Sequence, residues 1–125
     1  MPLHWTIDSK ARLFTTVGEG EVTLEDAKLL LQVVRGAGAL SYRKLLDVRA
    51  VQSAMKCGEL LELAAEIRGY HGRGPVGALA VVVTAEQTVK FARLLGALAA
   101  ADRPMKLFGD VRQARPWLEK QQAGQ

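Results

Sequence analysis

The stretch that most constrains the fold is "ALAVVV", Ala78–Val83, an unbroken apolar run of β-forming residues. A strand that is apolar on both sides must be covered on both faces, which is typical of parallel sheets with helices on each face. The chain has 125 residues, close to the commonest domain size, so we expect a single domain over residues 1–125. Its 49% hydrophobic and 24% charged residues predict one well-supplied core rather than disorder.

The N-terminal third predicts a hairpin followed by a helix. Apolar and polar residues alternate over Leu3–Ile7, the period of a half-buried strand, and Arg12–Val17 continues as a second strand. The sequence "GEGE", Gly18–Glu21, predicts a bend or an irregular end of that strand. Thr23 stands three residues before Asp26, which predicts a capped helix start. The inward stripe of this helix is Leu24, Ala27, Leu30, Leu31 and Val34.

The rest of the chain alternates strands with helices. The expected elements are a strand Lys44–Val48, a helix from Ser53 to Ile67 or beyond, the strand Ala78–Val83, a helix opened by a Thr84/Gln87 capping box, a strand Met105–Phe108, and a last helix capped by Asp110. Cys57, Leu60, Leu61, Ala64 and Ile67 are expected inward on the second helix, and Phe91, Ala92, Leu95, Leu98 and Ala99 belong to the third. Pro116 predicts a kink or a restart in the last helix.

The resulting order is β-β-α-β-α-β-α-β-α. It predicts an α/β fold with a mixed sheet of about five strands and about four helices, in which parallel strands joined by right-handed crossovers follow the antiparallel hairpin. In such sheets function gathers at the carboxyl ends of the strands. The candidate binding residues at that edge are Asp47, Arg49, Gln52, Ser53 and Lys56, with Thr84, Glu86, Gly109, Asp110 and Arg112 beside them.

Several function classes are disfavoured. Basic residues alternate with acidic ones, so no basic stripe for nucleic acid is evident despite a net charge of +4. Cys57 is the only cysteine, and neither His4 nor His71 is placed beside it or beside Ser53. We therefore expect no catalytic set, metal or cofactor. No apolar stretch is long enough to span a membrane and "MPLHWTID" is no signal peptide, so the cytoplasm is the expected location.

Two surface features leave alternatives open. The sequence "RGYHGRGPVG" is either a flexible helix-to-strand connection or an anion-binding loop using Arg68, Tyr70 and Arg73. The first helix also carries Leu29 and Val33, so its apolar arc is wider than packing on one sheet requires. One explanation is contact with a neighbouring helix on the same face. The other is a surface for a homodimer or a partner.

Several segments together resemble the SpoIIAA-like (STAS-like) bacterial proteins over nearly the whole chain. They are the N-terminal hairpin, "GEGEVTLEDAKLLLQVV", "YRKLLDVR", "GALAVVV" and "AAADRPMKLFGDVRQARPWL". The resemblance extends to anti-sigma-factor antagonists and, in fold, to the lipid-carrying CRAL-TRIO domain. It implies a four-to-five-stranded sheet flanked by helices and a small cytoplasmic protein without known catalysis and with a role in binding or regulation.

The resemblance also bears on Ser53. In the antagonists an Asp-Ser-[Ser/Thr]-Gly signature precedes the second helix, and its serine is phosphorylated. Here the matching loop is "RAVQSAMKCGEL", in which no aspartate precedes Ser53 and no glycine follows within the motif. This departure argues against phosphorylation and favours Ser53 as a helix N-cap.

Two hypotheses of function follow. The first is a non-enzymatic regulatory or protein-binding module that uses the second helix and the loop before it. The alternative is a small-molecule or lipid-binding module of CRAL-TRIO type.

Overall fold

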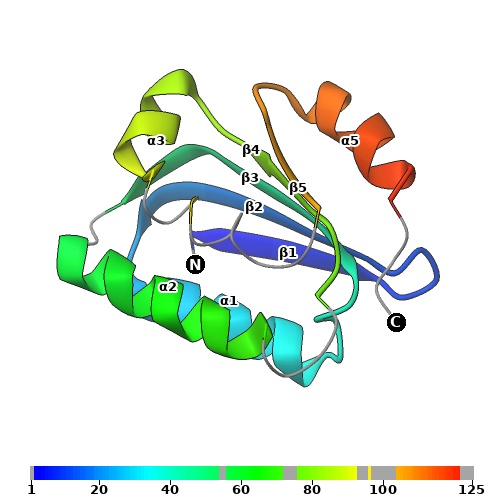
Figure 1. Cartoon of the computed structure of the whole chain (residues 1–125), viewed down its shortest axis with the longest axis horizontal. Helices are drawn as coiled ribbons and strands as arrows, with labels where there is room; N and C mark the ends of the chain where they lie inside the picture. Colours follow the sequence, from blue (N-terminus) through cyan, green and yellow to red (C-terminus); the bar gives the residue numbers. More distant parts are fainter. Residues whose placement is uncertain (1, 54–55, 72–75, 93–95, 97–103, 122–125) are drawn as a thin grey trace.

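The computed structural model describes residues 2–53, 56–71, 76–92, 96 and 104–121, without the side chains of Ser53, Cys57, Tyr70 and His71. Five strands form one sheet in the order β1-β2-β3-β4-β5 (Figure 1). β1 and β2 are antiparallel and all other neighbours are parallel. The strands are β1 Leu3–Asp8, β2 Leu13–Val22, β3 Arg43–Ser53, β4 Leu79–Val82 and β5 Met105–Phe108, and the helices are α1 Leu24–Gly36, α2 Cys57–His71, α3 Ala85–Lys90 and α5 Val111–Glu119. The predicted α/β fold is confirmed.

The β4 strand lies in the middle of the core, as its apolar run predicts. All four of its residues are buried, and so are Ala78 and Val83 on either side. Alternate residues enter different apolar clusters because successive side chains point to opposite faces. One cluster holds Leu79, Val81 and Val83, and the other holds Ala78, Ala80 and Val82.

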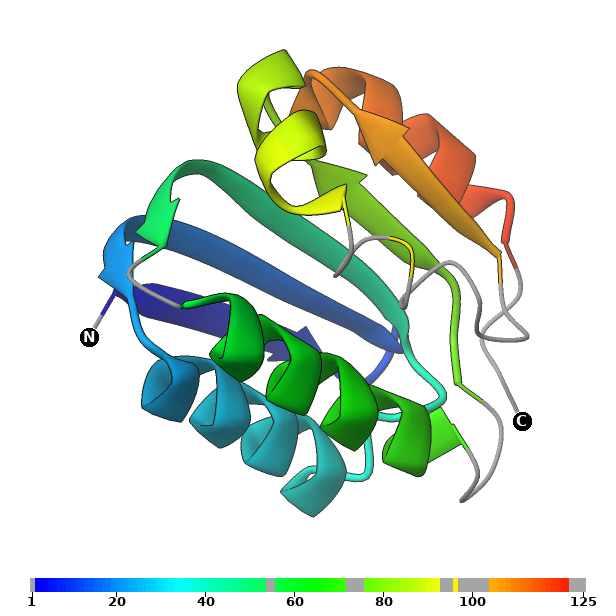
Figure 2. The same ribbon diagram turned by 60° about the vertical axis from the view of Figure 1, so that its left-hand side comes forward.

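Helices cover both faces of the sheet. α1 and α2 lie side by side on one face, and α5 packs on the other (Figures 1 and 2). The two flanks of α1 have different partners. Leu24, Ala27 and Leu31 join the cluster of α2, whereas Leu30, Val33 and Val34 join that of Phe14 and Trp5. These two contacts account for most of the wide apolar arc, although Leu29 remains 41% exposed.

The helix caps predicted for α1, α3 and α5 are confirmed. Complete capping boxes open α1 (Thr23 with Asp26) and α3 (Thr84 with Gln87), and Asp110 caps α5. α5 runs through Pro116 as one helix, so the predicted restart there is wrong.

The β3 strand is longer than expected, and this changes the position of Ser53. The segment Ala50–Ser53, expected as a loop and helix cap, pairs in parallel with Glu19–Val22 of β2. Ser53 is therefore the last residue of β3, and its assignment as N-cap of α2 is wrong. The helix begins at Cys57, and the residue before it, Lys56, donates its backbone N–H to Glu59 Oε1 at 3.0 Å. The same pairing keeps Gly18–Glu21 within β2, where they form an irregular strand end rather than a bend.

Other predictions are corrected or fall outside the described residues. Leu61, expected inward on α2, is 51% exposed, and Leu63 is buried in its place. Residues Gly69–His71, expected in a loop, end α2. Arg73 and most of the predicted third helix beyond Ala92, including Leu95, Leu98 and Ala99, lie outside the described residues, as does the inward placement predicted for the Cys57 side chain.

Candidate functional site

A β-bulge interrupts the pairing of β2 with β3 at the carboxyl edge. Val17 is opposite Asp47 and Glu19 is opposite Ala50, so the single residue Gly18 faces two residues of β3, Val48 and Arg49. A bulge of this kind bends the strand and redirects its side chains. Gly18 leaves room for it, because a Cβ at this position would lie 2.5 Å from Val51 Cγ2.

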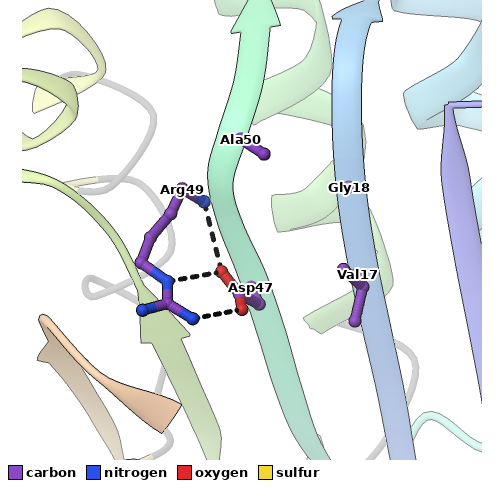
Figure 3. Close-up of a pocket in the computed structure, with 5 residues that line it drawn as sticks. All are labelled: Val17, Gly18, Asp47, Arg49 and Ala50. Atoms are coloured by element: carbon purple, nitrogen blue, oxygen red, sulfur yellow. Dashed lines mark hydrogen bonds and ion pairs between the residues drawn. The ribbon is translucent and has the colours of Figure 1, made fainter.

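Asp47 and Arg49 form a closed ion pair at the bulge (Figure 3). Asp47 Oδ1 accepts the backbone N–H of Arg49 at 3.2 Å and its Nε–H at 3.1 Å, and Oδ2 accepts from Nη2 at 2.9 Å. The hydrogen bonds from the Arg49 side chain lower the pKa of Asp47, and the same contact raises the pKa of Arg49. The Asp47 side chain is 15% exposed and that of Arg49 is 40% exposed. The guanidinium is thus held in place and still reaches solvent.

The ion pair borders a shallow hollow on the sheet. The volume of the hollow is about 320 Å³, and it is lined by Val17, Gly18, Asp47, Arg49 and Ala50 (Figure 3). Asp47 lies two residues after Leu45, which packs in the α5 cluster, so the hollow opens on the face that α5 covers elsewhere. Val17 is 46% exposed here. The site combines an exposed apolar floor with one charged rim.

A second Asp–Arg pair stands at the same edge. Asp110 accepts the Arg112 backbone N–H at 2.8 Å and its Nη2 at 3.0 Å, which repeats the geometry of Asp47 with Arg49. The pKa of Asp110 is lowered first by the Arg112 side chain and also by the charge of Arg49. The two pairs are therefore close enough to interact, and the edge presents charges of both signs.

Gln87 of α3 holds the bulged segment in position. Its Nε2 donates to the carbonyl oxygens of Val48 and Val51, while its Oε1 accepts the backbone N–H of Thr84 at 3.0 Å. The residue is only 7% exposed. Beyond Asp47, β3 pairs with β2 but no longer with β4, which leaves carbonyl groups on that side of β3 in need of donors. Gln87 supplies them, so the helix cap and the bulge form one unit.

The comparisons with known proteins bear on the fold. No protein-family model matches the sequence, and no curated protein matches it. Among solved structures, the chain is similar to an uncharacterized protein of the DUF3478 family from Shewanella loihica PV-4. The TM-score is 0.64 and the identity 17%, over 93% of each chain, and that protein is described as having a SpoIIAA-like fold. The present chain has a SpoIIAA-like fold.

On this SpoIIAA-like fold the candidate residues divide into two groups. Asp47 and Arg49 lie together at the hollow, and Asp110 with Arg112 lies beside them. Gln52 and Ser53 are further along β3 on its extension, and Lys56 is exposed at the start of α2; neither Gln52 nor Lys56 lines the hollow. Thr84 and Glu86 are exposed at the start of α3, as is Gly109 just before Asp110.

Sequence reasoning missed two features of the site. The first is the contact of Gln87 with β3, which no local pattern reveals. The second is the repetition of the Asp–Arg ion pair, and it had a signal: "DVR" occurs twice, at Asp47–Arg49, where β3 stops pairing with β4, and at Asp110–Arg112, just after β5. Within the described residues no three His, Cys, Asp or Glu side chains gather as metal ligands. Nor does any helix in this part of the chain have the length and apolar character needed to cross a membrane.

Proposed function

We propose that the chain is a non-enzymatic protein-binding module with a regulatory role, and that the partner contacts the edge formed by the bulge and the two Asp–Arg pairs. One observation carries the proposal: Arg49 is fixed by three hydrogen bonds to Asp47 and is still 40% exposed above the apolar hollow. A side chain fixed in this way loses little conformational entropy on binding. Arginine beside an apolar floor is also a common centre of protein interfaces.

The charge pattern favours a partner of mixed charge. Asp47, Arg49, Asp110 and Arg112 alternate in sign, and the Arg112 side chain is 90% exposed. Such a surface selects partners through complementary charges and rejects those with like charges opposite. The exposed Gln52 and Lys56 extend the same surface toward α2.

Comparative affinity capture tests the proposal. The bait is the full chain, and the test variant replaces Arg49 and Lys56 by Glu. A control variant carries the same charge change at the exposed Lys10 and Arg115, in the β1–β2 turn and on α5. We expect a partner that is captured by the wild type and the control and lost with the test variant. Equal capture by all three would remove this edge from consideration.

The hollow also supports the alternative of a small ligand. Its volume of about 320 Å³ is at the lower end of the range for ligand sites. An apolar group against Val17 with an anionic group at Arg49 would suit it. Native mass spectrometry of freshly purified protein distinguishes the two functions, because a retained small molecule adds a fixed mass. A clean apo mass in every preparation would count against a tightly held lipid.

A further inference from the structure

The outer edge of β1 is unpaired among the described residues. β1 is the first strand in the sheet order, and its register with β2 runs from Leu3 opposite Gly18 to Asp8 opposite Leu13 (Figure 1). An edge strand presents a row of free N–H and C=O groups on which another strand can pair. β1 carries no proline between Leu3 and Asp8, and both of its ends are tied down by hydrogen bonds at Pro2 and Asp8.

The hydrogen bonds to β2 determine which groups face outward. Glu19 donates its N–H to the carbonyl of Pro2 at 2.9 Å, so Pro2 belongs to a hydrogen-bonded pair. Such pairs alternate along antiparallel strands. His4, Thr6 and Asp8 therefore direct their main-chain groups toward β2, and Leu3, Trp5 and Ile7 direct theirs outward.

We propose that this edge pairs with β1 of a second copy of the chain, in an antiparallel homodimer with Thr6 on the two-fold axis. Only Leu3, Trp5 and Ile7 have outward main-chain groups, so a register can form hydrogen bonds only if it places these residues opposite one another. Every antiparallel register of this kind places one residue opposite itself on the two-fold axis. When that residue is Thr6, His4 of each copy lies opposite Asp8 of the other. If Trp5 or Ile7 were on the axis, neither pair would form. Charge and hydrogen-bonding complementarity thus select one register.

The His4–Asp8 contact suits the open face of the sheet. The His4 side chain is 61% exposed and lies 3.4 Å from Glu19 Oε1 of its own chain, which is the charged group facing it from β2. Asp8 Oδ1 accepts the backbone N–H of Ala11 at 3.0 Å, which fixes its carboxylate at the end of the strand. Imidazole carries an N–H donor in either protonation state, so it can bond to a carboxylate across the seam.

The other face supplies the apolar contact. In this register Trp5 lies opposite Ile7 of the second copy, and aromatic with β-branched pairs stabilise adjacent strands. Ile7 is 39% exposed. Val33 of α1 packs in the cluster of Trp5, and Leu29, one turn earlier and 41% exposed, lies on the same flank. This flank lies on the side of α1 away from α2, which is beside α1 in Figure 2. The proposed dimer would therefore cover apolar residues that the single chain leaves exposed.

Light scattering and sedimentation velocity on the full chain test the oligomeric state. We expect a dimer whose dissociation constant rises at least tenfold in Ile7→Pro. In the main chain this proline removes only an outward N–H, which edge strands tolerate, and it also removes the Ile7 side chain that faces Trp5. Ile7→Val keeps the N–H and should remain dimeric. Asp8→Asn keeps the acceptor for Ala11 and should weaken the dimer about fivefold, since it replaces the ionised acceptor of two exposed hydrogen bonds by a neutral one.

Crosslinking tests the register independently of folding losses in the proline variant. In a Cys57→Ala background, Thr6→Cys places two thiols across the axis in a non-hydrogen-bonded pair, with Cα atoms at about 4.5 Å, within disulfide range. We expect a covalent dimer that reductant dissociates, and none from Thr15→Cys on β2. A monomer at all concentrations, a dimer unaffected by Ile7→Pro, or crosslinking at Thr15 but not Thr6 would each overturn the proposal. If β1 paired only with an unrelated peptide and not with a second copy, the chain alone would be monomeric, and this result would also overturn the proposal.

Discussion

Replacing Gln87 by Glu is the sharpest test of how the candidate site is held together. The change keeps the shape of the side chain and the Oε1 acceptor for Thr84 N–H. It removes the donor to the carbonyls of Val48 and Val51 and places a carboxylate against both. Each buried acceptor left without its donor costs about 1–3 kcal/mol, so we expect Gln87→Glu to lower the free energy of unfolding by roughly 2–4 kcal/mol at pH 7.

A second helix, α5, provides a matched control. Gln113 occupies the third position of α5, as Gln87 does in α3, but it is exposed. A negative charge at either position interacts equally well with a helix N-terminus. Gln113→Glu should therefore change the free energy of unfolding by less than about 0.5 kcal/mol. The difference between the two variants isolates the contact with β3.

The pH dependence gives a second readout in the same assay, urea denaturation followed by tryptophan fluorescence. Burial beside two carbonyls should raise the pKa of the new carboxyl group in the folded state above its unfolded value of about 4.3. The folded state then binds more protons, so stability falls as pH rises through that range. The loss should be larger at pH 8 than at pH 5. Equal losses for Gln87→Glu and Gln113→Glu, or a larger loss at pH 5, would refute the role of Gln87.

Three further predictions concern neighbouring contacts. Gly18→Ala should lower the free energy of unfolding by roughly 1–3 kcal/mol because its Cβ would meet Val51 Cγ2 at 2.5 Å. Adding Val51→Ala should recover part of that loss. Strictly additive effects of the two substitutions on the free energy of unfolding would contradict this contact. Asp47→Asn should destabilise the fold above about pH 4, and its deficit against the wild type should vanish as pH falls through the lowered pKa of Asp47, which acid titration of stability would show. Arg43→Ala should lower the free energy of unfolding by about 2–3 kcal/mol. Its Nη1 donates to the carbonyls of Leu118, Glu119 and Gln121 at the end of α5, and its Nη2 donates to the carbonyl of Ala11. Unchanged urea midpoints in Arg43→Ala would exclude that anchoring role.

The elements that were predicted correctly have local signals. The apolar run at Ala78–Val83 and the capping pairs Thr23/Asp26 and Thr84/Gln87 are each readable within a few residues. Leu61 was placed inward instead of Leu63 because both border the buried stripe and only the packing of α2 separates them.

The extension of β3 could not be predicted in this way. It exists because Glu19–Val22 pair with Ala50–Ser53, which are about thirty residues away in the sequence. The sequence "GEGE" left a bend and an irregular strand end as alternatives because glycine is depleted in strands. In the fold, Gly18 makes room for Val51, and Gly20 adopts a φ of 74° that other residues rarely reach. The candidate site was located through Asp47 and Arg49, but its support from Gln87 depends on a contact between distant segments.

The bulge at Val48 and Arg49 has a consequence for sequence comparison and design. Side chains alternate between faces along a strand, and the extra residue shifts this alternation by one for everything after it. Val51 consequently lies against Gly18 and is half-buried, whereas Gln52 is exposed. A related or designed chain that lacks one residue here should carry the same inner and outer pattern one position closer to Asp47. An alignment that places its gap elsewhere would exchange the inner and outer faces of the segment Ala50–Ser53.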